Sequence, residues 1–329
     1  MFEATYAFSD SIARRMALLS AAAYVEGYAP SSELNFPNSA CNVPRVELIG
    51  SFDAPYDSAY AYMFLDHDDK MIVTSFEGTA DFQDVETDLM SIEIYDTECR
   101  LPVPQNNGST TFSLGYIHTG ICEYYLSLVS VGLPEAIADT AGAYPKYDVM
   151  MTGHSLGGAT ATLAAAHVVL QYGIEKSRLI LYSFGAPRPG DSGFTELVEE
   201  SVGSPYRVVH SFDVVPHLAP CCLGWFTCST DQMCPYHAAI EVWYDNLMEE
   251  GDGFTVCENS TEDKSCNKGL DLSVYDHNHY YEIGFGSYCN IQTSNESLNS
   301  NGSKDVPDAS PTLNIFKLVK NFLMTKNED

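Results

Sequence analysis

Short apolar runs alternate with longer segments of helical spacing in the middle of the chain. Apolar runs at 147–152, 178–184 and 206–212 predict strands, and apolar residues three or four positions apart at 155–172 and 192–202 predict helices. Strands that alternate with helices form crossover units in which the strands run parallel. The pattern therefore predicts an α/β fold with a mostly parallel central sheet flanked by helices.

The flanking segments carry weaker patterns. Residues 58–65 and 71–76 read as two strands of a hairpin. Residues 114–131 have helical spacing that stops at Gly132 and Pro134. Three other stretches are rich in loop-forming residues, and we expect them to be irregular: 26–55, 77–113 and, apart from a strand at 240–244, 216–275.

The N-terminal segment resembles a secretory leader only in part. A basic pair, Arg14-Arg15, precedes the apolar segment 16–24. Thirteen residues that include Glu3 and Asp10 come before this pair, which is unlike a leader. We therefore expect 16–24 to form a helix of the mature protein and the true leader to be absent from this chain.

The composition changes near residue 291. The chain becomes rich in Ser, Asn, Gly and Asp, and an apolar stripe with helical spacing returns at 313–324. We expect one domain over 1–290, followed over 291–329 by a polar linker and a C-terminal amphipathic segment.

Charge excludes several classes of function. The 329 residues contain 16 Lys and Arg against 45 Asp and Glu, a formal net charge of −29. A surface this acidic repels phosphate backbones and anionic headgroups, so we expect neither nucleic-acid binding nor polybasic attachment to a membrane. No apolar run reaches about 18 residues, so no transmembrane helix is expected. Contact with lipid would have to be apolar.

The cysteines indicate the cellular compartment. There are ten, and none of their spacings resembles a zinc site, so we expect no metal. Four Asn-x-Ser/Thr sequons accompany them. Together these features favour an oxidising, secretory environment and an extracellular protein. The sequons lie at Asn107, Asn259, Asn295 and Asn301.

One motif carries a candidate nucleophile. Gly153-His-Ser155-Leu-Gly157-Gly158 lies between a predicted strand and a predicted helix, the context of a nucleophile elbow. Glycines two positions before and after the serine avoid side-chain clashes on the sharp turn. The helix that follows points its first amides at the reacting centre, where negative charge develops. We assign the nucleophile to Ser155 and one oxyanion donor to the Leu156 amide.

A serine hydroxyl needs a base, and the base needs an acid that orients it. With this type of elbow the order along the chain is Ser, then Asp or Glu, then His. Asp213 directly follows the strand predicted at 206–212 and would reach the same sheet edge as Ser155. Asp191 is the rival, but it fits better as the N-cap of the helix at 192–202. We assign the acid to Asp213.

Four histidines follow Asp213 in the sequence. His217 is too close to it in the chain, and His237 precedes an apolar strand and is better explained as structural. The base is therefore His277 or His279, and the residue pattern alone does not separate these two.

Several motifs between about residues 18 and 289 resemble those of the fungal-type class 3 lipases. The serine motif is one, and Asp276-His277-Asn278-His279-Tyr280-Tyr281 resembles the family's D-H-x-x-Y-[FY]. The others are Leu18-Leu-Ser-Ala-Ala-Ala-Tyr24, Phe76-Glu-Gly-Thr79, His118-Thr-Gly120-Ile121, Phe184-Gly-Ala-Pro-Arg188, Asp213-Val-Val-Pro-His217 and Tyr236-His-Ala-Ala-Ile-Glu-Val-Trp-Tyr244.

The resemblance implies an α/β-hydrolase fold with a helical lid and no cofactor. In its register the base falls on His277, and the second oxyanion donor falls on Thr79. The lid would occupy 80–92, whose apolar residues are spaced by three or four. Glu77 departs from the family's usual arginine, so the ion-pair support of this loop must differ.

The family also implies disulfides between Cys41 and Cys289 and between Cys257 and Cys266. We expect the four cysteines between 221 and 234 to pair among themselves or with Cys99. Cys122 lies inside a predicted helix, where we expect it to be simply buried.

The expected function is hydrolysis of a carboxylic ester of a glycerolipid, with triacylglycerol as first choice. We expect a secreted monomer that acts at a lipid–water interface. The same family includes phospholipases A1 and feruloyl esterases, which the motif residues do not separate. A catalytically silent binding homologue would keep the same fold.

Overall fold

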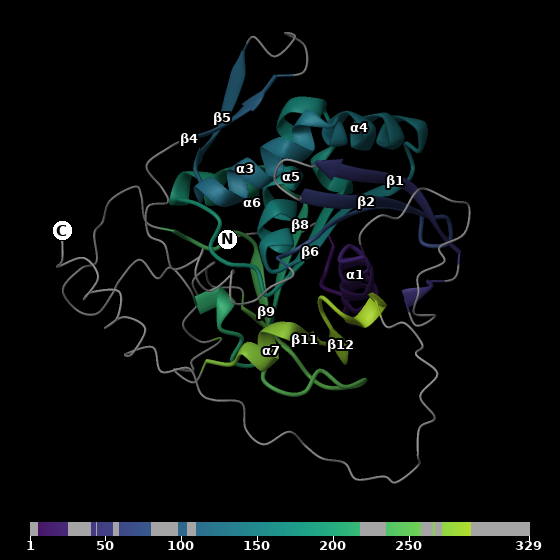
Figure 1. Ribbon diagram of the computed structural model, residues 1–329, viewed down its shortest axis with the longest axis vertical. Coiled ribbons are helices and arrows are strands. Elements are labelled where there is room, and N and C mark those ends of the chain that lie inside the picture. Colours follow the sequence, from purple (N-terminus) through teal and green to yellow (C-terminus); the bar gives the residue numbers. More distant parts are fainter. Residues whose placement is uncertain are drawn as a thin grey trace, which may run out of the picture.

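The central element is a sheet whose inner strands are parallel (Figure 1). A computed structural model describes residues 6–25, 41–43, 45–54, 59–79, 98–103, 110–217, 235–257, 266 and 272–290. In this part of the chain the sheet has eight strands in the order β1-β2-β3-β6-β7-β8-β9-β10. The pairs from β3 to β9 are parallel, and the pairs at both ends are antiparallel. The strands are β1 (Val46–Ala54), β2 (Ala59–Asp66), β3 (Met71–Phe76), β6 (Asp148–His154), β7 (Leu179–Phe184), β8 (Ser204–His210), β9 (Ile240–Tyr244) and β10 (Thr255–Cys257).

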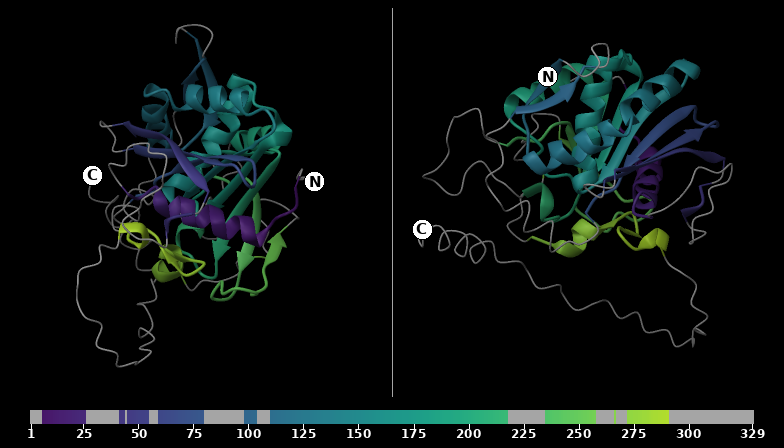
Figure 2. Two further views of the ribbon diagram at one scale, coloured as in Figure 1. Left: turned by 90° about the vertical axis from the view of Figure 1, so that its right-hand side faces the viewer. Right: turned by 45° about the horizontal axis from the view of Figure 1, so that its top comes forward.

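Helices cover both faces of this sheet (Figure 2). One apolar core lies beneath four helices: α3 (Thr119–Ser130), α4 (Leu133–Ala143), α5 (Leu156–Tyr172) and α6 (Ser192–Ser201). The second core lies on the opposite face, beneath α1 (Asp10–Ala22) and the segment 280–289. The expected α/β fold with a mostly parallel sheet is therefore confirmed.

The remaining elements are short. A separate hairpin pairs β4 (Glu98–Pro102) with β5 (Thr111–Tyr116). The C-terminal part of the described chain contains α7 (Val274–Asn278), β11 (His279–Tyr280) and β12 (Ile283–Gly284). The described residues also contain the 3-10 turns η3 (Lys176–Arg178), η4 (Val215–His217) and η5 (Tyr288–Asn290).

The structure confirms the predicted hairpin and the strand at 240–244. The helix expected at 16–24 is present with other bounds, because α1 begins at Asp10 and ends at Ala22. The helix predicted at 114–131 is wrong at its start, because Leu114 belongs to β5 and α3 begins only after its N-cap His118. Gly132 and Pro134 end α3 and also begin α4, which the sequence pattern missed. Gly132 has a positive φ of 86° as N-cap, and proline is tolerated in a first helical turn.

Three strands occur where we expected irregular structure. The register of β1 shifts between Leu48 and Gly50, and such a bulge breaks the two-residue alternation that reveals a strand in sequence. β4 and β10 have only five and three residues, too few for a clear pattern. The strand predicted at 206–212 is β8, which starts two residues earlier and ends at His210.

Three disulfides lie within the described residues. Cys41–Cys289 and Cys257–Cys266 confirm the two bridges that the family resemblance implied. The third, Cys99–Cys122, contradicts our expectation that Cys122 is simply buried, and it excludes one of the two alternatives for the later cysteines, namely pairing with Cys99. It joins β4 to α3, a contact between elements that the sequence pattern did not reveal.

Several expectations concern parts of the chain outside the described residues. These are the lid at 80–92, the four cysteines between 221 and 234, the four sequons and the C-terminal segment at 291–329. Among the described helices, none is by itself long and apolar enough to cross a membrane. The bent pair Thr119–Ser130 and Leu133–Ala143, at 61° to each other, passes the same test of length and composition together.

Candidate active site

Ser155 occupies a strained turn between β6 and α5. Its φ is 56° and its ψ is −125°, a conformation that residues with a side chain rarely adopt. A Cβ at Gly153 would lie 2.3 Å from the Gly157 backbone, and a Cβ at Gly157 would lie 2.3 Å from the Phe76 carbonyl oxygen. Both glycines are therefore required for the turn to close. This is the reason we inferred from the spacing of the motif.

Strand pairing brings the Thr79 loop to the same place. β3 and β6 are parallel, with Phe76 opposite Gly153, so the residues that follow both strands leave the sheet together. Leu156 is the first residue of α5, whose leading amides are free of intrahelical partners. Gly157, in the first turn of α5, faces the carbonyls of Phe76 and Glu77. The Leu156 amide and the residues that directly follow β3 are thus adjacent.

Asp213 and His277 form a buried pair. Nδ1 of His277 lies 2.9 Å from Oδ1 of Asp213, and the two side chains are 1% and 0% exposed. The Val215 amide donates to the same carboxylate oxygen at 2.9 Å, and the Tyr280 hydroxyl donates to the other oxygen at 2.5 Å. Burial and the neighbouring Asp213 charge raise the pKa of Tyr280 well above its usual value, so this hydroxyl keeps its proton. Three groups therefore fix the carboxylate.

Tyr280 was not among the residues that we assigned from the sequence. Its signal was the tyrosine of the D-H-x-x-Y motif, which we used only to choose between histidines.

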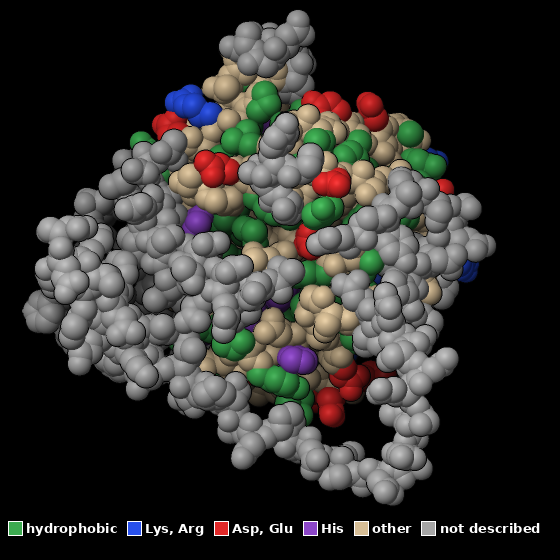
Figure 3. Space-filling model, viewed as in Figure 1, with side chains coloured by type: hydrophobic (Ala, Val, Ile, Leu, Met, Phe, Trp, Pro, Cys, Tyr) green, Lys and Arg blue, Asp and Glu red, His purple; other side chains and the backbone are tan. Residues whose placement is uncertain are grey.

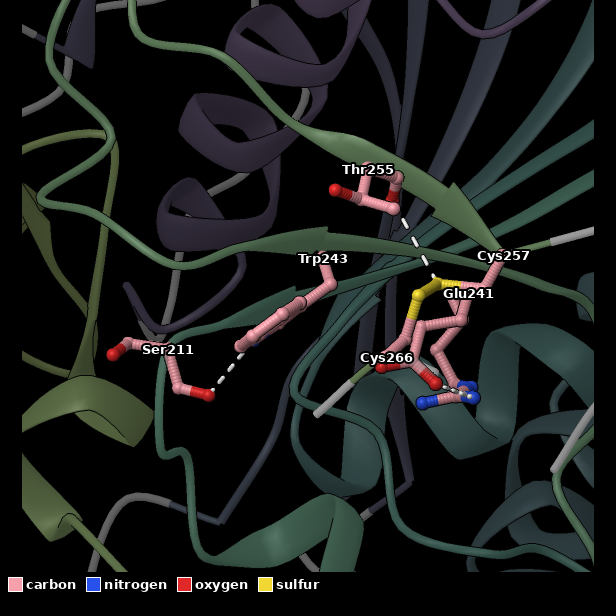
Figure 4. The surroundings of a disulfide bond; sticks show 7 residues. Ser211, Glu241, Trp243, Thr255, Cys257 and Cys266 are labelled. Atoms are coloured by element: carbon pink, nitrogen blue, oxygen red, sulfur yellow. Dashed lines mark hydrogen bonds and ion pairs between the residues drawn. A yellow bond between two sulfur atoms is a disulfide. The ribbon is translucent and has the colours of Figure 1, made fainter. Parts of the chain in front are cut away.

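A turn held by β9 carries Asp213. β8 ends at His210, and the next residue, Ser211, donates its amide to the Tyr244 carbonyl at 2.6 Å. The Ser211 carbonyl accepts from the Trp243 indole at 3.0 Å (Figure 4). The same view shows the Cys257–Cys266 disulfide beside Glu241, a β9 residue that forms a buried ion pair at 2.8 Å with Arg207 of β8. Covalent and polar contacts thus fasten the edge strands that support the turn.

Gly185 lies against the buried pair. A Cβ at this position would lie 2.5 Å from Oδ2 of Asp213 and 3.0 Å from both Nδ1 of His277 and the Tyr280 hydroxyl. Its φ is +57°, which also favours glycine. The second residue of the Phe184-Gly-Ala-Pro-Arg188 motif is therefore a position of close approach, a role that the sequence pattern did not suggest.

The other candidate groups have different partners. His279 stacks on Tyr275 and its Nδ1 contacts the Tyr275 carbonyl at 2.8 Å. His217 contacts the Asp213 carbonyl at 2.7 Å, and the buried His237 contacts the Pro216 carbonyl at 2.8 Å. Asp191 accepts from the Phe194 amide at 2.9 Å as the N-cap of α6. Of these groups, none takes the place of Asp213 or His277 in the buried pair.

Ser155 itself is 1% exposed. Within the described residues its Oγ is buried and makes no hydrogen bond. Over the same residues, no group of three or more His, Cys, Asp or Glu side chains is arranged to hold a metal ion.

A serine on a strained strand-to-helix turn, at the carboxyl edge of a parallel sheet, defines the α/β-hydrolases, and this protein is one of them. Residues 73–223 match the family model described as "Lipase (class 3)". Over these residues the chain is similar to the class 3 lipases.

Individual relatives show the same similarity. The chain is 37% identical over 161 residues to Lipase ZK262.3 of Caenorhabditis elegans, a match that covers 43% of this chain and 46% of the relative. It is 29% identical over 253 residues to the secreted mono- and diacylglycerol lipase 1 of Fusarium solani, covering 74% and 67%. Among solved structures, Rhizomucor miehei triacylglyceride lipase superposes with a TM-score of 0.67 at 27% identity, covering 88% of this chain and 100% of that one. The chain spans about half the length of the nematode relative.

Proposed function

We propose that this protein is a serine esterase that hydrolyses carboxylic esters of glycerolipids. The observation that carries the proposal is the buried hydrogen bond between His277 and Asp213, at the same sheet edge as the strained Ser155 elbow. Strain in a non-glycine residue persists only where the surrounding structure imposes it, and such residues cluster at active sites.

Each group has one role in the proposed reaction. His277 takes the proton of Ser155 as its Oγ attacks the acyl carbonyl, and Asp213 holds the imidazole in the tautomer whose Nε2 can accept that proton. The amides of Leu156 and Thr79 donate to the oxyanion. The bond to the alcohol breaks as His277 returns the proton to the leaving oxygen. Water then attacks the acyl-enzyme by the same route and releases the acid.

Three hydrogen bonds to the Asp213 carboxylate support its role as the acid that orients His277. Its oxygens accept from Val215, Tyr280 and His277, so the carboxylate is held in one orientation inside the protein. A charged acid of this kind stabilises the imidazolium that forms at His277 during each proton transfer.

The substrate class rests on the relatives. Their names describe lipases, including a triacylglyceride lipase and a mono- and diacylglycerol lipase. Triacylglycerol at a lipid–water interface is therefore our first choice for this chain. Phospholipids hydrolysed at the first acyl position and feruloyl esters are the alternatives within the same chemistry. The three described disulfides and the secreted relative support an extracellular location.

A fluorophosphonate probe and a panel of esters test the proposal. The wild-type protein should be labelled once, at Ser155, and Ser155→Ala should be neither labelled nor active while its thermal unfolding stays close to that of the wild type. Activity of Ser155→Ala above about a thousandth of the wild type would overturn the mechanism, because loss of a nucleophile typically costs far more. A folded wild-type protein that the probe does not label would instead be a silent binding homologue.

A further inference from the structure

Two histidines outside the Asp213–His277 pair bind the backbone around His277. His210, the last residue of β8, points its Nδ1 at the carbonyl oxygens of Asp276 and His279, at 3.2 and 2.5 Å. His154, the last residue of β6, points its Nε2 at the carbonyl oxygen of His277, at 2.7 Å. The two imidazoles thus contact three carbonyls within four consecutive residues.

The Asp276 carbonyl also accepts from the His279 amide, whereas the donors to the His277 and His279 carbonyls come from the two imidazoles. α7 has only five residues, Val274–Asn278, and the last carbonyls of a helix have no partner within it. A helix of one turn is not stable by itself, so its geometry is set by what it contacts. The direction of the His277 ring depends on that backbone, because a shift of the turn moves its Nε2 relative to Ser155.

The contacts of His210 require protons on both of its ring nitrogens. Nδ1 faces two carbonyl oxygens, and Nε2 faces the Asn246 carbonyl oxygen at 2.9 Å. A carbonyl oxygen accepts hydrogen bonds and donates none. A neutral imidazole has one N–H, so one of these contacts would bring two lone pairs together. Only the imidazolium satisfies both sides of this ring, which is 4% exposed.

The surroundings of His210 include one carboxylate and the Tyr280 ring. The Asp276 carboxylate accepts from the Phe212 amide at 3.0 Å, two residues from His210. The Tyr280 ring packs against the His210 ring with centroids 5.7 Å apart and an interplanar angle of 67°, and the Tyr280 hydroxyl links the His210 amide to Asp213. The titratable groups that face His210 from α7, β11, β9 and the turn after β8 are Asp276, His277, His279, Tyr280, Tyr244 and Asp213.

His154, in contrast, is a neutral imidazole. Its Nδ1 lies 2.7 Å from the Tyr24 hydroxyl, which also accepts from the Gly78 amide. The hydroxyl therefore donates to Nδ1, and Nε2 carries the single proton that the His277 carbonyl accepts. Burial, together with the neighbouring His277, lowers the pKa of His154 well below its usual value, in agreement with a neutral ring. The ring stacks on Phe285 with centroids 3.9 Å apart.

We propose that His210, as an imidazolium, and His154, as a neutral imidazole, are positioning residues that hold the α7 turn and thereby aim His277 at Ser155. The inference deepens the proposed hydrolase function and rests on it. It assigns a positive charge to one buried histidine and no charge to the other, although both face backbone carbonyl oxygens.

Nitrogen-15 NMR of the protein labelled at its nine histidines tests the charge states without any assay of activity. At pH 8 one ring should give two imidazolium-type nitrogen signals, and this pair should vanish in His210→Gln. The His154 ring should show a protonated Nε2 and an unprotonated Nδ1. Absence of any imidazolium at pH 8 in the wild type would overturn the proposal, even if the variant failed to fold.

Kinetics test the positioning role. His210→Gln should lower kcat on a small soluble ester by about 10- to 100-fold, because misplacement near 1 Å has effects of that size, with KM changed less than about twofold. The matched control is His167→Gln, which removes another buried imidazole, in α5, that contacts Tyr125 rather than α7. A kcat for His210→Gln no lower than that of His167→Gln would overturn the proposal. If the wild type hydrolyses no ester, the proposed function fails, and the NMR result still decides the charge states.

Discussion

At the candidate site, the atoms that surround a position decide which residue type can stand there. Gly185 has Asp213, His277 and Tyr280 within 3.0 Å of the position that a Cβ would occupy, so a methyl group there must displace the acid, the base or the tyrosine. Gly173, at the end of α5, has a similar φ of +73° but nothing within 4 Å. Alanine substitutions at the two glycines therefore distinguish the effect of backbone strain from the effect of a side-chain collision.

Gly185→Ala is expected to abolish measurable turnover, whereas Gly173→Ala should keep it. Both variants should lose stability through the positive φ, by roughly 1–2 kcal/mol. Gly185→Ala should lose more, because its methyl group also collides with Asp213 at 2.5 Å. Urea unfolding and ester hydrolysis on the purified variants measure the two effects. Equal activity of the two variants would show that the site tolerates the displacement.

The two candidate bases also differ at this scale. His277→Ala should cost about as much activity as Ser155→Ala, because nucleophile and base act as a unit. His279→Ala should keep most of its turnover, since this ring stacks on Tyr275 and does not contact Asp213. Rates of ester hydrolysis for both variants decide the point. A greater loss of activity in His279→Ala than in His277→Ala would identify His279 as the base.

Elements contribute through their contacts with one another. α5 carries the Leu156 amide at its first residue and a buried histidine, His167, near its other end. His167 lies 2.9 Å from the Tyr125 hydroxyl of α3, and this contact joins the two helices beneath the sheet. Burial lowers the pKa of His167 to about 4. The stability of this contact between α3 and α5 therefore depends on the pH of the solution.

Acidification should weaken the protein through His167. A folded-state pKa below the ordinary value of 6.5 means that the neutral ring stabilises the fold above pH 6.5 and that this contribution is lost as the pH falls toward 4. The loss is up to about 3 kcal/mol for this one group. The free energy of unfolding should therefore fall less between pH 6.5 and 4 in His167→Gln than in the wild type. Parallel curves would contradict the prediction.

The whole molecule is organised around two apolar cores and a strongly acidic surface. The Cys41–Cys289 bridge ties the chain before β1 to the turn after β12, across a separation of 248 residues. On the face shown in Figure 3 the acidic side chains of the described residues are dispersed. With a net charge of −29, long-range electrostatics oppose approach to anionic surfaces.

Activity on phosphatidylcholine vesicles that contain triacylglycerol should exceed activity on matched vesicles with added phosphatidylglycerol. The charge of −29 repels the anionic vesicles, and salt screens this repulsion over about 10 Å at 0.1 M. The difference should therefore narrow as salt is added, while hydrolysis of a small uncharged ester stays constant. Faster hydrolysis on the anionic vesicles at low salt would contradict the electrostatic argument.

Much of the fold and the candidate site could be predicted because the signals are local. The alternation of strands and helices follows from hydrophobic periodicity, and the Ser155 turn follows from glycines at fixed spacing. The bulged β1, the short β4 and β10, and the start of α4 at Gly132 and Pro134 were missed. Their local patterns are short or interrupted, and pairing with neighbouring strands or packing on the core decided them.

The sequence by itself determined the α/β class, the glycine spacing of the Ser155 turn and the role of Asp191 as a helix N-cap. Each depends on residues adjacent along the chain, where sterics and helix capping act directly. Only the tertiary structure decided the Cys99–Cys122 bridge, the close approach at Gly185 and the contacts of His154 and His210 with the α7 turn. These depend on distances between segments far apart in the chain, which folding alone brings together.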